Sequence, residues 1–349
     1  MYSFSCDYLE GCHPDVLAAL CETNMEQAPG YGDDRFTAEA IREIREACQD
    51  DSAAIHFVNG GTQTNQLVID TMLDSYEGVL AAETGHVNVH EAGAIEFSGH
   101  KVLALPAHNG KVAADDVRDY VHRFYADGNH DHMVFPGMVY ISHPTEYGTL
   151  YTADELRDLA DACHQSGLKL FLDGARLGYG LAADGTDVTL PLIDELCDVF
   201  YIGGTKVGAL NGEAVVFPRG KEPSHYLTRI KQHGALFAKG RLVGVQFATL
   251  FKDNLYLRIS RHAIEMAGQI RQIFEDAGYE MYIDSPTNQQ FVVLANDDME
   301  RLSKYVGFGF WEELDADHTV VRFASSWATM QEGVDELRAA VATCLKKTE

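Results

Sequence analysis

Residues 168–176 read LKLFLDGAR and residues 199–206 read VFYIGGTK, and these two stretches decide the predicted fold. Each opens with an apolar run typical of a buried parallel strand, at 168–172 and at 199–202. Each run ends in a turn of small and polar residues. Because open α/β sheets bind ligands just beyond the carboxyl ends of their strands, we expect Asp173 and Lys206 to face one crevice.

A carboxylate and a lysine in one crevice favour pyridoxal phosphate as the ligand. The lysine would hold the aldehyde as a Schiff base, and the carboxylate would keep the pyridine nitrogen protonated so that the ring accepts electrons. Each residue alone has a simpler interpretation, since Lys206 also fits a solvated turn and Asp173 a helix cap. The segment is not a Walker A motif, in which the lysine precedes the hydroxyl residue. The prediction rests on the combination.

The length of 349 residues exceeds the usual size of a single core, so we expect two domains. A large α/β domain would span residues 1–250, N-terminal arm included, and a small α+β domain residues 251–349. The apolar fraction of 46% and the charged fraction of 23% are those of an ordinary globular protein. The net charge of −26 argues against nucleic acid and anionic membranes as partners, because both bind basic surfaces.

The seven cysteines form no C-x-x-C pair and are odd in number, which is typical of free thiols in a reducing compartment. The first residues lack the basic and apolar regions of a signal peptide, and no apolar run approaches membrane-spanning length. We therefore expect a cytoplasmic protein.

Strand and helix patterns alternate along the first two thirds of the chain, which predicts a mostly parallel sheet. Strands are expected at 53–58, 79–82, 101–105 and 138–142, and helices at 14–23, 113–126 and 152–166. Thr37 is expected to cap a further helix. The strand pattern at 213–217 has no crossover helix before it, so it should pair antiparallel to its neighbour.

The last third of the chain predicts the small α+β domain. Helical patterns run from about 240 to 277 and share one apolar stripe, made of Ile259, Ala263, Met266, Ile270 and Phe274. Strand patterns follow near 290–295 and 318–324, and a final helix is expected from about 330.

A glycine turn follows the predicted strand at 53–58. Residues 59–65 read NGGTQTN and lead into a helix. Such a turn exposes backbone N–H groups at the positive end of the helix dipole, an arrangement that binds phosphate.

The motifs DGAR at 173–176, GGTK at 203–206, GGTQTN at 60–65 and GYGDD at 30–34 occur together in this chain. In combination they resemble the low-specificity L-threonine aldolases, within the β-eliminating lyase group. The resemblance covers nearly the whole chain and implies a fold-type I pyridoxal-phosphate enzyme with a mostly parallel seven-stranded sheet. Residues 7–14 and the PTEYGT segment at 144–149 are closer to the phenylserine-aldolase-like branch.

The resemblance implies roles for the residues that match its motifs. Lys206 would form the internal aldimine, Asp173 would pair with the pyridine nitrogen, and Arg176 would lie near the cofactor's phenolic oxygen and the substrate carboxylate. His86 would stack on the ring, with a buried structural histidine as the alternative. The phosphate would be held by Gly61, Thr62 and Thr205, in agreement with the glycine turn.

Two further matches concern the substrate. Arg322 corresponds to the arginine that fixes the α-carboxylate, a task that suits its planar guanidinium group. Tyr31 lies on a loop that in relatives reaches the site of a neighbouring subunit. The resemblance therefore implies a homo-oligomer, a dimer or a homotetramer, with the active site at a subunit interface.

One segment departs from the family pattern, because Glu146 stands where many threonine aldolases have a histidine near the substrate β-hydroxyl. The base for that hydroxyl is thus Glu146, His86 or a water between them, with His143 a weaker candidate. The basic residues Lys231, Lys239 and Arg241 receive no role. The ligand-type residues at 127–132 follow a helix in a polar loop, so we expect no metal site there.

The preferred hypothesis is a lyase that cleaves L-β-hydroxy-α-amino acids, such as L-threonine, L-allo-threonine or L-phenylserine, by a retro-aldol reaction to glycine and an aldehyde. A β-eliminating lyase that yields pyruvate and ammonia is the alternative, and Glu146 in place of histidine keeps it open. A non-catalytic pyridoxal-phosphate-binding protein is a third possibility.

Overall fold

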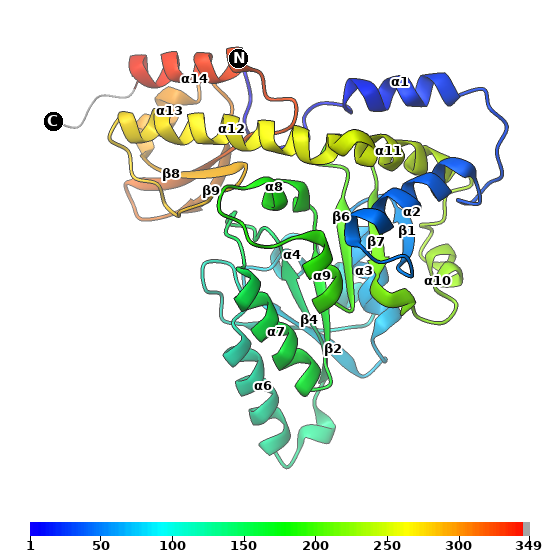
Figure 1. Cartoon of the computed structure of the whole chain (residues 1–349). Helices are drawn as coiled ribbons and strands as arrows, with labels where there is room; N and C mark the ends of the chain where they lie inside the picture. The colour runs from blue at the N-terminus through cyan, green and yellow to red at the C-terminus, as the bar shows by residue number, and fades with distance from the viewer. Residues whose placement is uncertain (345–349) are drawn as a thin grey trace.

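The computed structural model describes residues 1–344, and a seven-stranded sheet forms its centre (Figure 1). The strands are β1 (Ala54–Val58), β2 (Glu77–Ala82), β3 (Val102–Leu105), β4 (Phe135–Ser142), β5 (Lys169–Asp173), β6 (Val199–Gly203) and β7 (Glu213–Phe217). Their order across the sheet is β1-β7-β6-β5-β4-β2-β3. Strand β7 is antiparallel to β6 and β1, and the other neighbours are parallel. The predicted mostly parallel sheet and the antiparallel strand at 213–217 are confirmed.

Helices cover both faces of this sheet, which is why its central strands are continuous apolar runs. One face packs against α2 (Arg35–Cys48), α6 (Ala114–Ala126), α7 (Ala153–Gln165), α8 (Leu177–Ala182), α9 (Leu190–Leu196) and α11 (Arg241–Phe251). The opposite face packs against α3 (Gly61–Met72), α4 (His86–Val89), α5 (Ala94–Phe97) and α10 (Tyr226–Gln232). Short 3-10 turns lie at His130–His132, Pro218–Gly220 and Lys252–Asn254.

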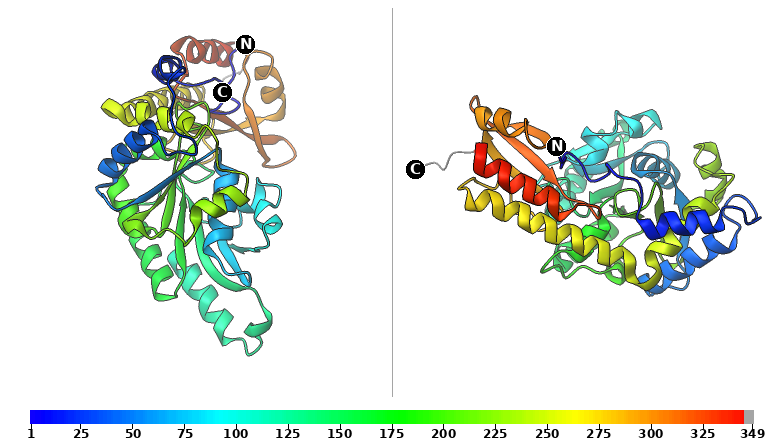
Figure 2. Two further views of the ribbon diagram at one scale, coloured as in Figure 1. Left: turned by 90° about the vertical axis from the view of Figure 1, so that its right-hand side faces the viewer. Right: turned by 90° about the horizontal axis from the view of Figure 1, so that it is seen from above.

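A second, antiparallel sheet contains β8 (Gln289–Ala295), β9 (Gly309–Glu313) and β10 (His318–Ala324) in the order β8-β10-β9. It packs with α12 (Leu255–Asp276), α13 (Asn296–Leu302) and α14 (Gln331–Cys344) around a separate apolar core. Seen from above, α12 and α14 run side by side over this sheet (Figure 2). The division into domains at residue 250 stays a prediction.

The N-terminal arm (residues 1–13) connects the two sheets before α1 (Pro14–Thr23) begins. Phe4 is buried in the core of the small sheet, where its N–H donates to Gly307 O (2.7 Å) and its carbonyl accepts from Ala324 N (2.8 Å). At the other end, His13 N donates to Gly208 O (2.9 Å), just beyond β6. The arm therefore passes over the carboxyl edge of the large sheet.

One local prediction was wrong. Asp34, not Thr37, caps α2: its Oδ1 accepts from the backbone N–H groups of Phe36 and Thr37. The helical patterns predicted at 240–277 form two helices, because Asp253 and Asn254 adopt left-handed backbone angles (φ 51° and 58°) between α11 and α12. The apolar stripe falls within α12, and all of it is buried.

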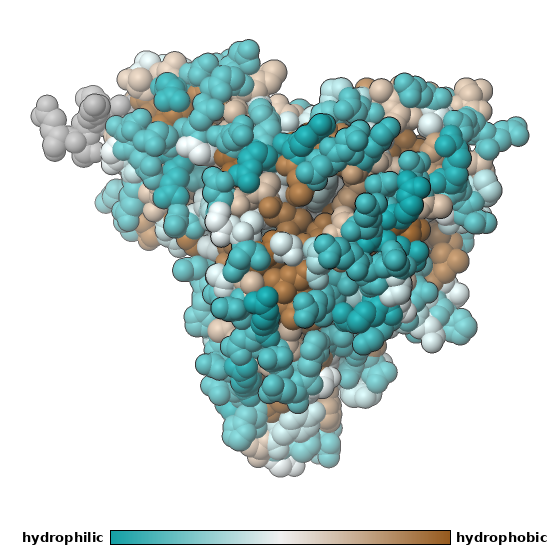
Figure 3. Space-filling view, in the orientation of Figure 1, coloured by the Kyte–Doolittle hydropathy of each residue, from teal (hydrophilic) through white to brown (hydrophobic). Residues whose placement is uncertain are grey.

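Hydrophilic residues dominate the face drawn in Figure 3, and apolar ones gather in a narrow strip near its middle. Within residues 1–344, no helix combines the length and the apolar character needed to cross a membrane.

Candidate active site

Two adjoining cavities open at the carboxyl edge of the large sheet. The first, about 490 Å³, lies over β5 and β6 and is lined by Asp173, Lys206 and the start of α3. The second, about 530 Å³, extends from it toward the small sheet and is lined by Trp311 and Arg322, among others. We call them the cofactor cavity and the side-chain cavity. Both are lined by Tyr8, His86, His90, Glu146, Arg176 and Lys206.

Asp173 is the last residue of β5 and is almost fully buried in the cofactor cavity. Its carboxylate accepts hydrogen bonds from the hydroxyls of Tyr140 and Tyr201 (both 2.5 Å) and from Asn65 Nδ2 (3.0 Å). Burial alone would raise the pKa of Asp173, but the nearby His86 and the two hydroxyls lower it. Asp173 is therefore held as a buried carboxylate.

Lys206 follows β6 in a turn that Gly203 and Gly204 make possible by their close packing. A Cβ on Gly203 would lie 2.4 Å from Ala175 O, and one on Gly204 would lie 2.7 Å from Gly212 O. Burial and then the positive charge of Arg176 lower the pKa of Lys206. A lowered pKa makes an amine a better nucleophile at neutral pH.

The N-terminus of α3 points at the same cavity. Its N-cap is Gly60, which has no side chain to satisfy the first N–H groups, and Gly61 and Thr62 line the cavity. Thr205 lies opposite, and its hydroxyl accepts from Gly212 N (3.1 Å). Free N–H groups at the positive end of a helix dipole are suited to a phosphate group.

His86 begins α4 and lines both cavities. Its Nδ1 lies 2.7 Å from Oε1 of the buried Glu91, and the same oxygen accepts from Asn65 Nδ2 (2.7 Å). Because that amide nitrogen also donates to Asp173, a chain of contacts joins the imidazole to the buried aspartate. Glu91 thereby directs Nδ1 inward and leaves Nε2 for the cavity.

Glu146 is buried beside His86. Its Oε1 accepts from His86 N (2.9 Å) and from Ser142 Oγ (2.7 Å). Burial raises the pKa of Glu146, and the charge of Asp173 adds to the rise. His143, the weaker candidate for the base, is fully buried against Tyr151 and lines neither cavity.

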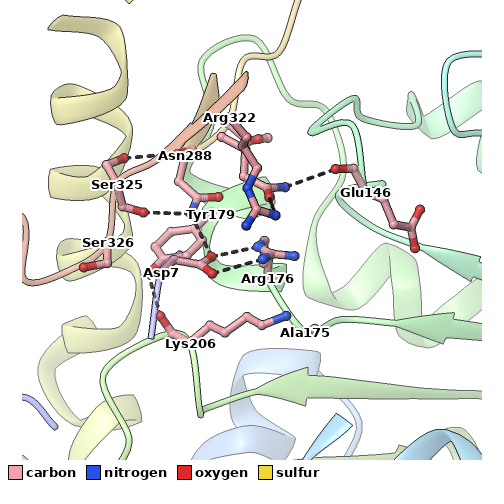
Figure 4. A network of polar contacts seen from close by, with 12 residues as sticks. Asp7, Glu146, Ala175, Arg176, Tyr179, Lys206, Asn288, Arg322, Ser325 and Ser326 are labelled. Atoms are coloured by element: carbon pink, nitrogen blue, oxygen red, sulfur yellow. Dashed lines mark hydrogen bonds and ion pairs between the residues drawn. The ribbon is translucent and has the colours of Figure 1, made fainter. Parts of the chain in front are cut away.

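Two arginines lie where the arm, the large sheet and the small sheet meet (Figure 4). Arg176 donates through Nε and Nη2 to the two carboxylate oxygens of Asp7 (2.7 and 3.0 Å). Arg322, on β10, donates through Nη1 to Gln289 (3.1 Å) and through Nη2 to the Ser5 carbonyl (3.0 Å). Its Nε is buried and has no hydrogen-bond partner among residues 1–344.

The other basic residues and Tyr31 lie outside both cavities. Tyr31 is 53% exposed, and the ammonium group of Lys231 lies 4.8 Å from the centre of its ring. Lys239 is exposed, whereas Arg241 donates to Thr23 O and Glu26 O and so fixes the end of α1. In the described part of the chain, no three histidine, cysteine or acidic side chains gather as a metal site would require.

Several residues of the site were not predicted. Tyr140 and Tyr201 look like core residues of their strands, yet a buried tyrosine needs a partner for its hydroxyl, and Asp173 provides it. Asp7 belongs to the quoted segment 7–14, but its pairing with Arg176, 169 positions away, was not predicted. Asn65 was part of a quoted motif, although its bond to Asp173 was not foreseen.

These residues fit pyridoxal phosphate on chemical grounds. A buried carboxylate, a lysine with a lowered pKa and an uncapped helix N-terminus share one cavity, as the ring nitrogen, the aldehyde and the phosphate of that cofactor would require.

Comparison with known proteins gives a consistent result. The family model described as β-eliminating lyase matches residues 6–304. The low specificity L-threonine aldolase of a Pseudomonas strain is 31% identical over 339 residues, which is 96% of each chain.

Solved structures agree. The structure of Leishmania major threonine aldolase has a TM-score of 0.94 and 39% identity, and the match covers 98% of this chain and 99% of that one. An aspartate aminotransferase from Thermus thermophilus matches over 97% of this chain and 89% of its own, with a TM-score of 0.67 and 14% identity. The latter shows the fold alone.

Proposed function

Because the chain belongs to the β-eliminating lyase family, we propose that it is a pyridoxal-phosphate-dependent aldolase that cleaves L-β-hydroxy-α-amino acids to glycine and an aldehyde. The observation that carries the proposal is the meeting of Lys206, Asp173 and the α3 N-terminus in one cavity. The names of the threonine aldolases that the chain resembles along nearly its whole length support the reaction type.

Pyridoxal phosphate, when bound, supplies an electron sink for the charge that remains on Cα after the Cα–Cβ bond breaks. We assign Lys206 as the residue that carries it covalently and Asp173 as the partner of its ring nitrogen. Gly61, Thr62 and Thr205 would hold the phosphate, and His86 would flank the ring. The lowered pKa of Asp173 supports its role, because the carboxylate must stay charged to keep that nitrogen protonated.

Arg322 is assigned to the substrate α-carboxylate, since it lines the side-chain cavity and its planar guanidinium group suits a carboxylate. Arg176 is assigned a place near the phenolic oxygen of the cofactor and the substrate carboxylate. Its Nε and Nη2 donate to Asp7, and its positive charge lowers the pKa of Lys206, after burial.

Glu146 is assigned as the base that removes the β-hydroxyl proton. A raised pKa makes a carboxylate a stronger base, and this one lies in both cavities. The hydroxyl proton would pass to Glu146 as the Cα–Cβ bond breaks and the aldehyde leaves. His86, with Nε2 open to the cavity, is the second candidate.

The protein is proposed to act as a cytoplasmic homo-oligomer, a dimer or a tetramer. Phe310 (65% exposed) and Val89 (50% exposed) line the side-chain cavity, and such apolar exposure in a single chain supports a partner surface. The free cysteines support a reducing compartment. Light scattering should give two or four times the monomer mass, and a monomer would contradict the assignment.

The decisive experiment incubates cofactor-loaded protein with L-threonine, L-allo-threonine, L-phenylserine, L-serine and L-tyrosine. Glycine with the matching aldehyde is expected from the first three, and Lys206→Ala should form neither. Pyruvate and ammonia without glycine would instead identify a β-eliminating lyase. A bound cofactor with no product from any amino acid would identify a binding protein.

A further inference from the structure

The side-chain cavity lies where the β-substituent of a substrate would extend, a placement that rests on the proposed function. With the cofactor over Asp173 and the α-carboxylate at Arg322, the rest of the substrate faces the wall that the small sheet builds. That wall carries Trp311 and Glu312 of β9, with Glu83 and Tyr147 from the loops that follow β2 and β4. A methyl group such as that of threonine would leave most of this cavity, about 530 Å³, unused.

An irregularity in β9 turns successive side chains toward the cavity. Val321 pairs with Phe310 and Val320 with Glu312, so Trp311 is an extra residue in the ladder. Side chains alternate between faces in a regular strand, but a bulge breaks the alternation. Phe310, Trp311 and Glu312 therefore all line the same cavity.

Aromatic rings form one side of this space. The ring of Trp311 lies edge-on to Tyr147, with 5.3 Å between the centroids, and is backed by the buried Phe291 at 4.8 Å. Tyr147 in turn lies 6.4 Å from Tyr282. Such rings contact flat or extended hydrocarbon, and the guanidinium carbon of Arg322 lies 5.7 Å from the centre of the Trp311 ring.

A carboxylate stands beside these rings. Oε1 of Glu312 is buried and accepts no hydrogen bond from the described residues. A hydrogen bond to Glu312, with burial, raises the pKa of Tyr282 to about 12, which places the tyrosine hydroxyl at the same carboxylate. Burial and then the charge of Glu312 raise the pKa of Tyr147, and the charge of Glu83 adds to the rise. Glu312 therefore brings a negatively charged side chain to the wall of the cavity.

We propose that the side-chain cavity is a specificity subsite for L-β-hydroxy-α-amino acids whose side chain is extended and ends in a positively charged group. Trp311 and Tyr147 contact the hydrocarbon part, and Glu312 pairs with the cation. Aromatic faces combined with an acidic group are a general way to bind such cations.

The test measures dissociation constants by calorimetry on the cofactor-loaded enzyme. L-Lysine carries the cation, L-2-aminoheptanoic acid replaces the ammonium by a methyl group, and L-2-aminoadipic acid carries a negative charge. None has a β-hydroxyl group, so none can undergo retro-aldol cleavage, and binding is read without turnover. We expect L-lysine to bind about tenfold more tightly than the methyl analogue and the acid to bind most weakly.

The matched variants are Glu312→Gln and Glu313→Gln, neighbours on one strand of which only Glu312 lines the cavity. Glu312→Gln should remove the preference for L-lysine, whereas Glu313→Gln should retain it. Equal binding of L-lysine and the methyl analogue, or a preference that survives in Glu312→Gln, would overturn the subsite. Cleavage of L-threonine is assayed separately. Absence of cleavage would contradict the aldolase proposal, whereas absence of the binding preference would contradict only the subsite.

Discussion

At the scale of single residues, the site depends on a buried carboxylate that stays charged. Asp173 has four hydrogen-bond donors within reach: two tyrosine hydroxyls, Asn65 and the backbone N–H of Ala175. The charge of His86 and these donors stabilise the charged form, and together they outweigh the effect of burial on the pKa of Asp173. The donors are therefore as important to the chemistry as the carboxylate they hold.

Tyr201→Phe removes one donor and should raise the pKa of Asp173. Because the aspartate must be ionised, the acidic limb of kcat/KM against pH for L-threonine cleavage should move upward by roughly one unit. Tyr226→Phe is the control, since the Tyr226 hydroxyl is buried without a partner among residues 1–344. An acidic limb that stays in place in Tyr201→Phe would contradict this account of Asp173.

Asp7 should contribute to stability in a pH-dependent way. Burial would raise the pKa of Asp7, but Arg176 and Lys206 lower it far below its usual range. A carboxyl group with a lowered folded-state pKa stabilises the fold above its unfolded pKa of about 4, and this stabilisation is lost as pH falls toward the lower value.

Asp7→Asn should therefore reduce the melting temperature at pH 7, since breaking a buried pair costs about 3–5 kcal/mol. The variant should also show a smaller loss of stability than the wild type between about pH 5 and pH 2. Calorimetry across this range measures both effects. If the melting temperatures of the wild type and Asp7→Asn fall in parallel with pH, the Asp7–Arg176 pair does not govern acid stability.

At the scale of elements, the turn after β5 allows no side chain at Gly174. A Cβ there would lie 1.9 Å from the carbonyl oxygen of Tyr201 on β6. Gly174→Ala must push β5 and β6 apart, so it should cost at least about 3 kcal/mol of unfolding free energy. Gly128→Ala meets nothing within 4 Å and should change it by no more than about 0.5 kcal/mol. Denaturant unfolding compares the two, and similar values would contradict the packing argument.

The elements differ in how well their sequence predicts them. Strands β5 and β6 were predictable because burial on both faces makes each a continuous apolar run. Because these runs mark where the strands end, the positions of Asp173 and Lys206 at the carboxyl edge of the sheet were predictable too. Strand β9 was not foreseen: its mixed FWEE sequence does not alternate, because a bulge and a cavity, not a pleated surface, decide which side chains face inward.

The same contrast holds for the site. Lys206, Asp173 and the α3 N-terminus follow directly from strand ends and a glycine turn. Asp7 and Glu91 could not be predicted, because a polar residue far from its partner in sequence gives no local signal of an ion pair or of a histidine contact. Tertiary packing alone brings these residues together.

At the scale of the whole molecule, the net charge of −26 is a source of self-repulsion. Raising the NaCl concentration from about 0.01 M to about 0.3 M shortens the range of that repulsion from about 30 Å to under 10 Å. We expect the melting temperature to rise by a few degrees over this interval, as measured by scanning fluorimetry. A melting temperature that falls with added salt would mean that surface ion pairs outweigh the repulsion.

The contacts of the N-terminal arm can form only late in the synthesis of the chain. The Tyr2 hydroxyl accepts from Met330 N (3.0 Å), Phe4 pairs with Gly307 and Ala324, and the Ser5 carbonyl accepts from Arg322. During synthesis residues 2–5 leave the ribosome before partners that are made more than 300 positions later. The large sheet has all its strands by residue 217, long before those partners exist. A translation product that stops before residue 322 can therefore contain the strands that frame the cofactor cavity while lacking Arg322, so the two cavities are complete only after β10 is made.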